Sequence, residues 1–236
     1  MKKVHLTANV LATGATYAIE QAWHLLRDAV LLIQNKRYAS SLVLATFCLE
    51  QLGRAEIYRE NAKDASAGKR VTLGSMGRSL TNHLPKLFKA KIPVTVSMPV
   101  YGEPPAPGSQ AAIKLAERLT AFRKILENEA PQKALEVRKR ALHVDRISHF
   151  AGWNRPSKAI TRDDADYWVG AAHVRYGLLR SELEGDNSPV GKKIWAVTQQ
   201  LELQESSWNL WTWEEESAED RQALKLIGER AFGGQA

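Results

Sequence analysis

Apolar residues recur at steps of three and four along the first third of the chain, which is the spacing of one face of an α-helix. The first stripe contains Ala15, Ile19, Ala22, Leu26, Ala29, Val30 and Ile33. It predicts a long amphipathic helix over about residues 8–34, ending near Asn35 and Lys36. A second stripe consists of Leu42, Ala45, Leu49 and Leu52. It predicts a helix over about residues 39–63, and because only a short turn separates the two, we expect an antiparallel hairpin.

Glycine and proline interrupt this pattern in the middle of the chain. The composition of residues 68–77 predicts a loop. In the basic segment 78–91 that follows, Pro85 must interrupt a helix or begin a new one. Five of the nine prolines crowd residues 93–107, with valines between them. This composition predicts an extended, proline-rich insertion at about residues 92–109.

The helical pattern returns after the insertion. Residues 110–128 predict one helix, and Pro131 is well placed to open another that ends at residues 152–156. Thr161, with Asp164 three positions later, resembles a helix-opening cap, and an apolar helical face follows it. We therefore expect an all-α up-and-down bundle, because no segment strongly indicates a strand.

The last part of the chain differs in composition. Residues 185–189 break the helical pattern, and Trp195, Trp208, Trp211 and Trp213 follow. We expect two domains, a helical bundle over residues 1–184 and a tryptophan-rich, helical C-terminal extension over residues 185–236. The extension, with a terminal helix at 217–231, would pack on the bundle or mediate association.

Composition limits the class of protein. With 44% apolar and 25% charged residues the chain is globular, without a low-complexity tract. The single cysteine, Cys48, excludes an intrachain disulfide and fits a reducing compartment. No apolar run approaches transmembrane length, so we expect a cytoplasmic protein without a membrane partner.

The basic excess is local. Residues 1–100 hold fourteen Lys and Arg against six Asp and Glu, whereas the rest of the chain is nearly balanced. Residues 62–91 and 133–158 each contain seven basic side chains. Such clusters attract the phosphate backbone of RNA, although ordinary solvated faces have the same composition.

Two arginines in these stretches stand five positions before a histidine, as Arg78 with His83 and Arg138 with His143. An arginine offers a planar cationic fork to a phosphate, and a histidine moves protons near neutral pH. Together they suggest RNA cleavage without a metal. Two matches barely exceed chance, and each histidine is equally compatible with an ordinary surface position.

Helix geometry distinguishes the two pairs. In a continuous α-helix, two side chains five positions apart point in directions about 140° apart around the helix axis. An arginine and a histidine that act together must therefore lie on either side of the N-terminal end of a helix. Arg78 follows a glycine-rich stretch, which favours Arg78 and His83, with Lys86 as a second phosphate contact. Arg138 lies inside its predicted helix, and with His143 it stays the second candidate pair.

Charged residues on the second predicted helix are further candidates. Glu50 and Arg54 stand at i and i+4 of an otherwise apolar helix. They form either a surface salt bridge or a charged network that orients the histidine. Glu20 and His24 have the same spacing, but two ligands do not make a metal site, and we expect no metal and no cofactor.

The order of several short motifs resembles a known family. Residues 28–32, 37–39 and 49–54 resemble the start of the AbiV family of abortive-infection proteins, a branch of the HEPN superfamily. Further on, His83-Leu84-Pro85-Lys86 is similar to the family's motif His-x-x-Lys. The segment Ala141-Leu142-His143-Val144-Asp145 is similar to the family's Ala-Leu-Tyr-Val-Asp, and residues 156–172 are similar to its proline followed by a helix. The resemblance covers residues 8–175. The sequence departs from the family pattern at Arg54, where lysine is expected, at His143, where tyrosine is expected, and in the proline-rich insertion.

The resemblance implies a HEPN-like bundle that dimerises, antiphage defence by growth arrest, and metal-independent RNA cleavage. In HEPN nucleases an arginine precedes the histidine by four to six residues, and two copies face each other across the dimer. The motif usually lies on a late helix, which favours Arg138 and His143, so both pairs stay open. Some HEPN proteins do not cut RNA. The alternative is a non-catalytic dimer that binds RNA or protein and blocks translation or senses a phage protein.

The candidate site residues fall into three groups. The catalytic candidates are Arg78, His83 and Glu50. The second pair is Arg138 and His143. The RNA-binding candidates are Arg54, Lys86, Lys89, Arg140 and Arg146. The expected partners are an RNA such as tRNA, rRNA or mRNA, a second copy of the chain, and a phage-encoded activator or an antitoxin.

Overall fold

The computed structural model describes residues 5–92, 110–143 and 155–203, with no side chains described at 111–126 or at 202 and 203. This part of the chain contains eight helices and no strand beyond one isolated bridge. The helices are α1 (Ala8–Gln34), α2 (Tyr38–Ser66), α3 (Leu73–Thr81), α4 (His83–Lys89), α5 (Gln110–Leu142), α6 (Pro156–Ala159), α7 (Arg162–Glu184) and α8 (Pro189–Leu203). The predicted all-α class is confirmed.

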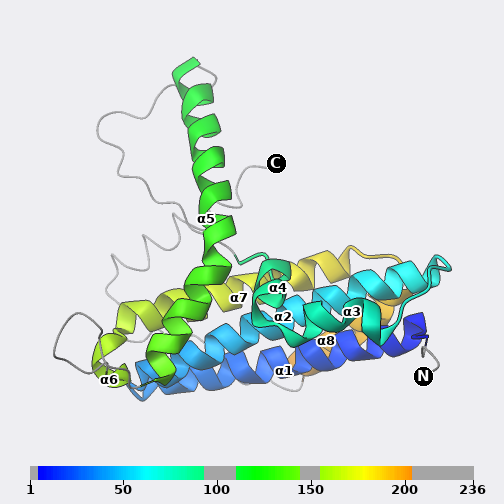
Figure 1. The fold of residues 1–236 in the computed structure, drawn as a ribbon, viewed down its shortest axis with the longest axis horizontal. Coiled ribbons are helices and arrows are strands. Elements are labelled where there is room, and N and C mark those ends of the chain that lie inside the picture. The colour runs from blue at the N-terminus through cyan, green and yellow to red at the C-terminus, as the bar shows by residue number, and fades with distance from the viewer. Residues whose placement is uncertain (1–4, 93–109, 144–154, 204–236) are drawn as a thin grey trace. The chain divides into compact units, whose positions relative to one another are not determined.

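Helices α1 and α2 form the antiparallel hairpin that the apolar stripes predicted (Figure 1). Thr7 caps α1 by accepting the Val10 amide at 3.3 Å, which satisfies one free N–H of the first turn. At the other end Lys36 adopts a left-handed φ of 58° and turns the chain into α2. Both predicted helices are confirmed, and α2 runs three residues beyond its predicted end.

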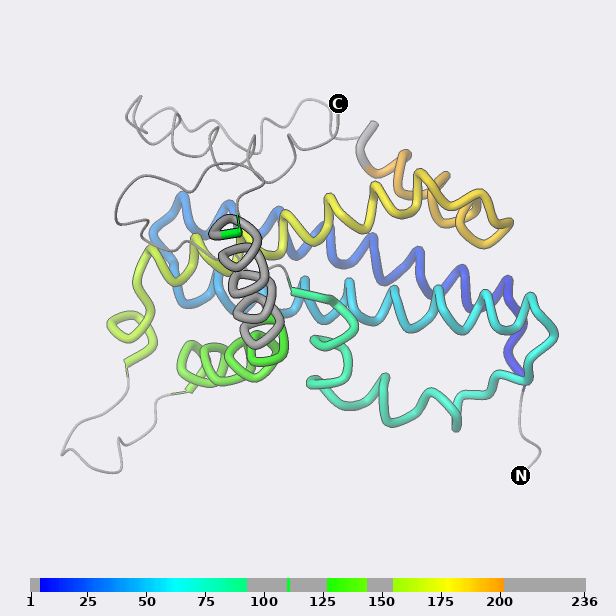
Figure 2. The backbone as a smooth tube through the Cα atoms, turned by 90° about the horizontal axis from the view of Figure 1, so that it is seen from above, coloured from blue at the N-terminus to red at the C-terminus, as the bar shows by residue number. Residues whose placement is uncertain are grey.

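The core lies where α7 and α8 pack on this hairpin (Figure 2). Fully buried side chains from the four helices fill it, including Leu11, Leu26, Leu42, Leu49, Leu52, Leu179, Leu183 and Ile194. Each such side chain stabilises the fold by about 1.5–3 kcal/mol relative to exposure to water. The core therefore holds α2 along its whole length.

The predicted loop over residues 68–77 was wrong in its second half, because α3 begins at Leu73. Thr72 and Ser75 form a reciprocal capping box, and buried Met76 fastens the short helix to the bundle. These contacts outweigh the low helix propensity of the glycines. After extended Asn82, α4 begins at His83 with Pro85 in its first turn, so the predicted restart is confirmed.

Helix α4 packs directly on α2 at Gly53. A Cβ atom built on Gly53 would lie 1.7 Å from the carbonyl oxygen of Lys86 and 3.0 Å from the amide nitrogen of Ala90. Such distances are far inside van der Waals contact, so only glycine fits beneath α4. This contact sets the distance between α4 and α2.

Helix α5 is continuous from Gln110 to Leu142, so the predicted helix start at Pro131 and end at residues 152–156 were wrong. Pro131 is buried beside Ala130 and Ala134, and this packing compensates for the hydrogen bond that a proline cannot donate. Figure 1 shows that α5 bends along its length. Its C-terminal half contacts α2, α4 and α6.

Helix α7 begins with the predicted cap, a capping box of Thr161 and Asp164, which is confirmed. Its buried Arg175 donates to Glu56 of α2 at 2.6 Å and pairs with Glu182 at 3.1 Å. Burial raises the pKa of Glu56, although Arg59 and Arg175 oppose that shift. This ionic network ties α7 to α2 on the C-terminal half of that helix.

Residues 1–204 form one compact unit and residues 205–236 another. The domain boundary expected at residue 185 stays a prediction, and α8, which follows it, packs on α1 and α7. The predicted insertion at about 92–109 lies outside the described residues except for its first position, Ile92. The tryptophans from Trp208 onward and the predicted terminal helix at 217–231 lie outside them as well. Among the helices described, none is both long enough and apolar enough to cross a membrane.

Candidate active site

Three basic side chains converge on Glu50, a residue of α2 that is only 3% exposed. Its Oε2 atom lies 2.8 Å from Nδ1 of His83 and 3.4 Å from Nζ of Lys86, both on α4. Its Oε1 atom accepts a hydrogen bond from Nη1 of Arg138 on α5. The carboxylate therefore joins three helices at one point.

The surroundings of Glu50 keep it ionised. Burial alone raises the pKa of this carboxyl, but the hydrogen bonds from His83 and Arg138 and the charges of Arg138 and Lys86 outweigh it. The pKa of Glu50 therefore lies below its ordinary value of 4.5. Because an ionised carboxylate only accepts hydrogen bonds, Nδ1 of His83 must carry the proton. In the neutral ring Nε2 is then free to accept one.

Exposure separates the roles of the three basic groups. The side chain of His83 is 53% exposed, whereas those of Lys86 and Arg138 are 4% and 8% exposed. The Arg138 guanidinium also lies 4.9 Å above the Phe47 ring, a cation–π contact that fixes its orientation. Lys86 and Arg138 thus hold Glu50, and His83 is the member of the cluster that reaches solvent.

The cluster is positive. One carboxylate set against one lysine and one arginine leaves a net charge of +1 while His83 is neutral, and +2 when it is protonated. A positive site with a half-exposed histidine attracts a phosphate ester and offers it a proton acceptor.

The other candidates from the N-terminal half of the chain lie on α2, α3 and α4. Arg78 is exposed on α3, the helix that precedes His83. Arg54 is half-buried on α2, one turn after Glu50, and its buried Nε has no hydrogen-bond partner among the described residues. Lys89 is exposed at the end of α4 and pairs with Glu60 at 2.5 Å.

The candidates from the second basic stretch do not lie together in the structure. Arg138 is buried against Glu50, whereas His143 is exposed immediately after the end of α5. Arg140 donates to the carbonyl of Ala159 at 2.9 Å, and Arg146 lies outside the described residues. The structure therefore brings together one member of each predicted pair, His83 from the first and Arg138 from the second.

Sequence reasoning did not anticipate the pairing of Arg138 with Glu50 and Phe47. Phe47 and Glu50 stand three positions apart and share one face of α2, which is visible in the sequence. Arg138, which is 88 residues away from Glu50 in the sequence, carries no such signal, because its position depends on how α5 docks. In the described part of the chain, no three His, Cys, Asp or Glu side chains gather as metal ligands would.

The low pKa of Glu50 predicts how stability depends on pH. A carboxyl whose pKa is lowered by folding contributes stability above its ordinary pKa of 4.5, and this contribution is lost as the pH falls through the folded value. At pH 7, Glu50→Gln leaves Arg138 and Lys86 without their counter-charge, so we expect a loss of about 3–5 kcal/mol. The difference from wild type should shrink below about pH 4.5 in urea unfolding curves. Glu60→Gln, which removes an exposed partner of Lys89, is the control and should cost under about 1 kcal/mol.

The fold and the match to a family model together indicate the class of protein. An all-α bundle that brings an arginine and a histidine together on one carboxylate is compatible with a HEPN domain. The family model described as AbiV, a HEPN family, matches residues 10–177. The chain belongs to the AbiV family, and the resemblance seen in its motifs is confirmed.

The family match covers the whole Glu50 cluster and stops before α8. It associates the chain with abortive infection and with the HEPN type of nuclease fold. No curated protein and no solved structure matches the chain. The arrangement of the cluster therefore has to carry the functional argument.

Proposed function

We propose that this AbiV-family protein is a metal-independent endoribonuclease that arrests growth in the cytoplasm of a phage-infected cell. The observation that carries this proposal is the 2.8 Å hydrogen bond between buried Glu50 and Nδ1 of half-exposed His83. A base oriented by a buried carboxylate is a recurring arrangement for activating a hydroxyl nucleophile.

The chemistry follows from the free Nε2 of His83. This nitrogen removes the proton of a ribose 2′-hydroxyl, and the resulting oxygen attacks the adjacent phosphorus. The bond from phosphorus to the 5′ oxygen of the next nucleotide breaks, and that oxygen takes up a proton from a histidinium. The products are one RNA end with a 2′,3′-cyclic phosphate and one with a 5′-hydroxyl.

The remaining candidates support this step in different ways. Lys86 and Arg138 are nearly buried, which favours positioning roles: they keep Glu50 charged and correctly placed. Arg78 is exposed on the preceding helix and is the better candidate for contacting the phosphate. Arg54 is half-buried one turn after Glu50 and is a further candidate for contacting RNA through the exposed part of its side chain.

The need for both a base and an acid predicts a dimer. One copy offers one His83, so two copies facing each other about a two-fold axis supply a base and an acid to the same phosphate. We expect light scattering at micromolar concentration to give twice the mass of the 236-residue chain. A strictly monomeric protein would remove the shared-site arrangement.

Cleavage in the presence of EDTA is the direct test. Purified protein incubated with tRNA or total RNA and EDTA should produce fragments with 2′,3′-cyclic phosphate ends. Because no step uses a metal, EDTA should leave the rate unchanged. Loss of cleavage on chelation, with recovery on adding a divalent cation, would contradict the mechanism.

The near burial of Lys86 and Arg138 favours one alternative function. If both cations serve only to hold Glu50, the cluster is a structural element, and the protein acts as a non-catalytic dimer that binds RNA, a phage protein or an antitoxin. Intact RNA in the EDTA assay, together with retained growth arrest in cells, would select this alternative.

A further inference from the structure

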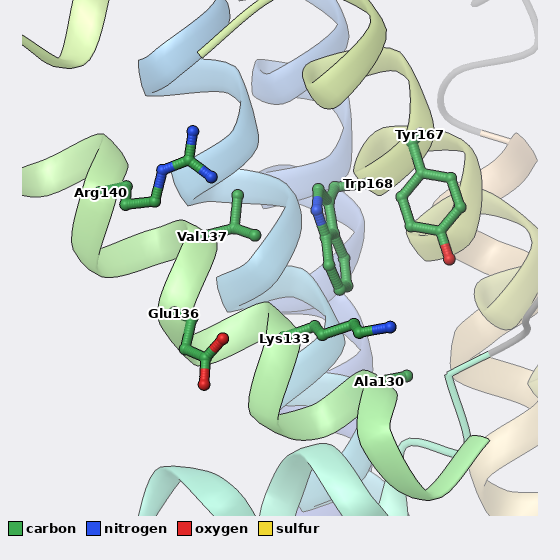
Figure 3. Close-up of a pocket in the computed structure, with 7 residues that line it drawn as sticks. All are labelled: Ala130, Lys133, Glu136, Val137, Arg140, Tyr167 and Trp168. Carbon is green, nitrogen blue, oxygen red and sulfur yellow. The ribbon is translucent and has the colours of Figure 1, made fainter. Parts of the chain in front are cut away.

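A second polar site lies on the other side of α5, between this helix and α7. It is a pocket of about 450 Å³ that residues of the Glu50 cluster do not line. Its walls include Lys133, Glu136, Val137, Arg140, Tyr167 and Trp168. Figure 3 shows that the first four come from α5 and that the two aromatic rings face them from α7.

Two aromatic side chains form the α7 wall of the pocket. Tyr167 and Trp168 meet edge to face, with ring centroids 5.3 Å apart and planes at 90°. Trp168 is anchored in the core at 5% exposure, whereas Tyr167 is 45% exposed. Tyr167 is therefore the ring that a flat ligand can reach, and the buried Trp168 holds it in place from behind.

The opposite wall supplies positive charge. Lys133 extends beneath the rings toward Tyr167 (Figure 3). Its charge opposes the rise that burial causes in the pKa of that tyrosine. The Lys133 side chain is 54% exposed and pairs with Glu129 one turn earlier on α5 at 3.2 Å, so an anionic ligand competes with that carboxylate. Arg140 lines the same wall two turns further along α5. Glu136 stands between them at the rim and repels an anion from the middle of the wall.

An aromatic platform beside a half-exposed ammonium matches a ligand that is flat at one end and anionic at the other. We propose that the pocket between α5 and α7 binds a nucleotide, with the base against the exposed ring of Tyr167 and the phosphate on Lys133. Such a unit is either a free nucleotide or one nucleotide of an RNA strand. The proposal does not depend on cleavage at Glu50.

Isothermal titration of the full chain with adenosine 5′-monophosphate tests the site. The nucleotide should bind at least about tenfold more tightly than adenosine, which lacks the phosphate, or inorganic phosphate, which lacks the base. Tyr167→Ala and Lys133→Gln should each weaken binding about tenfold. Raising the salt concentration should remove most of the Lys133 effect.

The control variant is Glu136→Gln, on the same wall and close in size. It removes a negative charge and should strengthen nucleotide binding about twofold. Because Tyr167 and Lys133 are substantially exposed, circular dichroism should show both variants folded.

A short oligoadenylate distinguishes the two sources of the nucleotide. If it binds more than about tenfold more tightly than the mononucleotide and displaces it, the pocket holds part of an RNA strand. If it fails to displace the mononucleotide, the pocket takes the free nucleotide. Undetectable binding of the mononucleotide at about 10 mM, which corresponds to less than about 3 kcal/mol of binding free energy, would overturn the proposal. Equal binding by wild type, Tyr167→Ala and Lys133→Gln would overturn it as well.

Discussion

His83→Ala is expected to abolish growth arrest and to slow RNA cleavage at least about 100-fold, in a protein that still folds and dimerises. A positioned general base contributes about 10²- to 10⁴-fold to a rate, and this variant removes the only cluster member that is half exposed. RNA affinity should change little, because it comes mainly from the many Lys and Arg contacts and depends on salt. Gel assays of cleavage and of binding measure the two quantities separately.

His143→Ala is the paired control, because His143 also stands five residues after an arginine. It lies at the exposed end of α5, and its removal should leave cleavage within about threefold of wild type. If His143→Ala abolishes cleavage and His83→Ala does not, the second pair is the working site. If growth arrest persists in the double variant, histidine catalysis is ruled out and the binding function remains.

Gly53→Ala is expected to destabilise the protein strongly, because α4 lies directly over this glycine. The new Cβ would lie 1.7 Å from a backbone carbonyl of α4, so the helix has to move off α2. Overpacking of this kind costs about 3 kcal/mol. The movement also carries His83 and Lys86 away from Glu50, so the cleavage rate should fall together with the free energy of unfolding. Urea unfolding and the cleavage assay measure the two effects.

Gly170→Ala on α7 is the matched control. A Cβ on Gly170 meets no heavy atom within 4 Å, and alanine is the better helix former by about 1 kcal/mol. The variant should therefore be as stable as wild type or slightly more stable. An unfolding free energy of Gly53→Ala within about 0.5 kcal/mol of wild type would show that α4 is not held by this contact.

Local sequence signals explain which helices were predictable. The apolar stripes of α1 and α2 have a strict helical spacing, and Thr161 with Asp164 opens α7 by a cap that acts within four residues. The helix α3 was missed because its glycines suggest a loop, whereas its stability comes from a capping box and from buried Met76. A single α5 was missed because burial of Pro131 offsets a helix-breaking tendency that is read from sequence alone.

The candidate site was predictable residue by residue but not as an arrangement. Glu50, His83, Lys86 and Arg138 all carry the right chemistry, and the family motifs include most of them. Two Arg–His pairs were considered because spacing along the chain is all that a motif offers. The contact of His83 and Arg138 with the same carboxylate depends on the docking of α4 at Gly53 and of α5 on α2, which is tertiary packing.

Glu50 and Arg138 are separated by 88 residues, which has a consequence for the order of folding. The hairpin of α1 and α2 can close with α4 through contacts within residues 5–92, whereas Arg138 arrives only when α5 docks. A chain made from its N-terminus therefore carries Glu50 and His83 before it holds the arginine that keeps the carboxylate charged. Until then the buried carboxyl takes up a proton more readily and orients His83 less firmly. The cluster therefore reaches its full arrangement only after α5 has been made and has docked on α2.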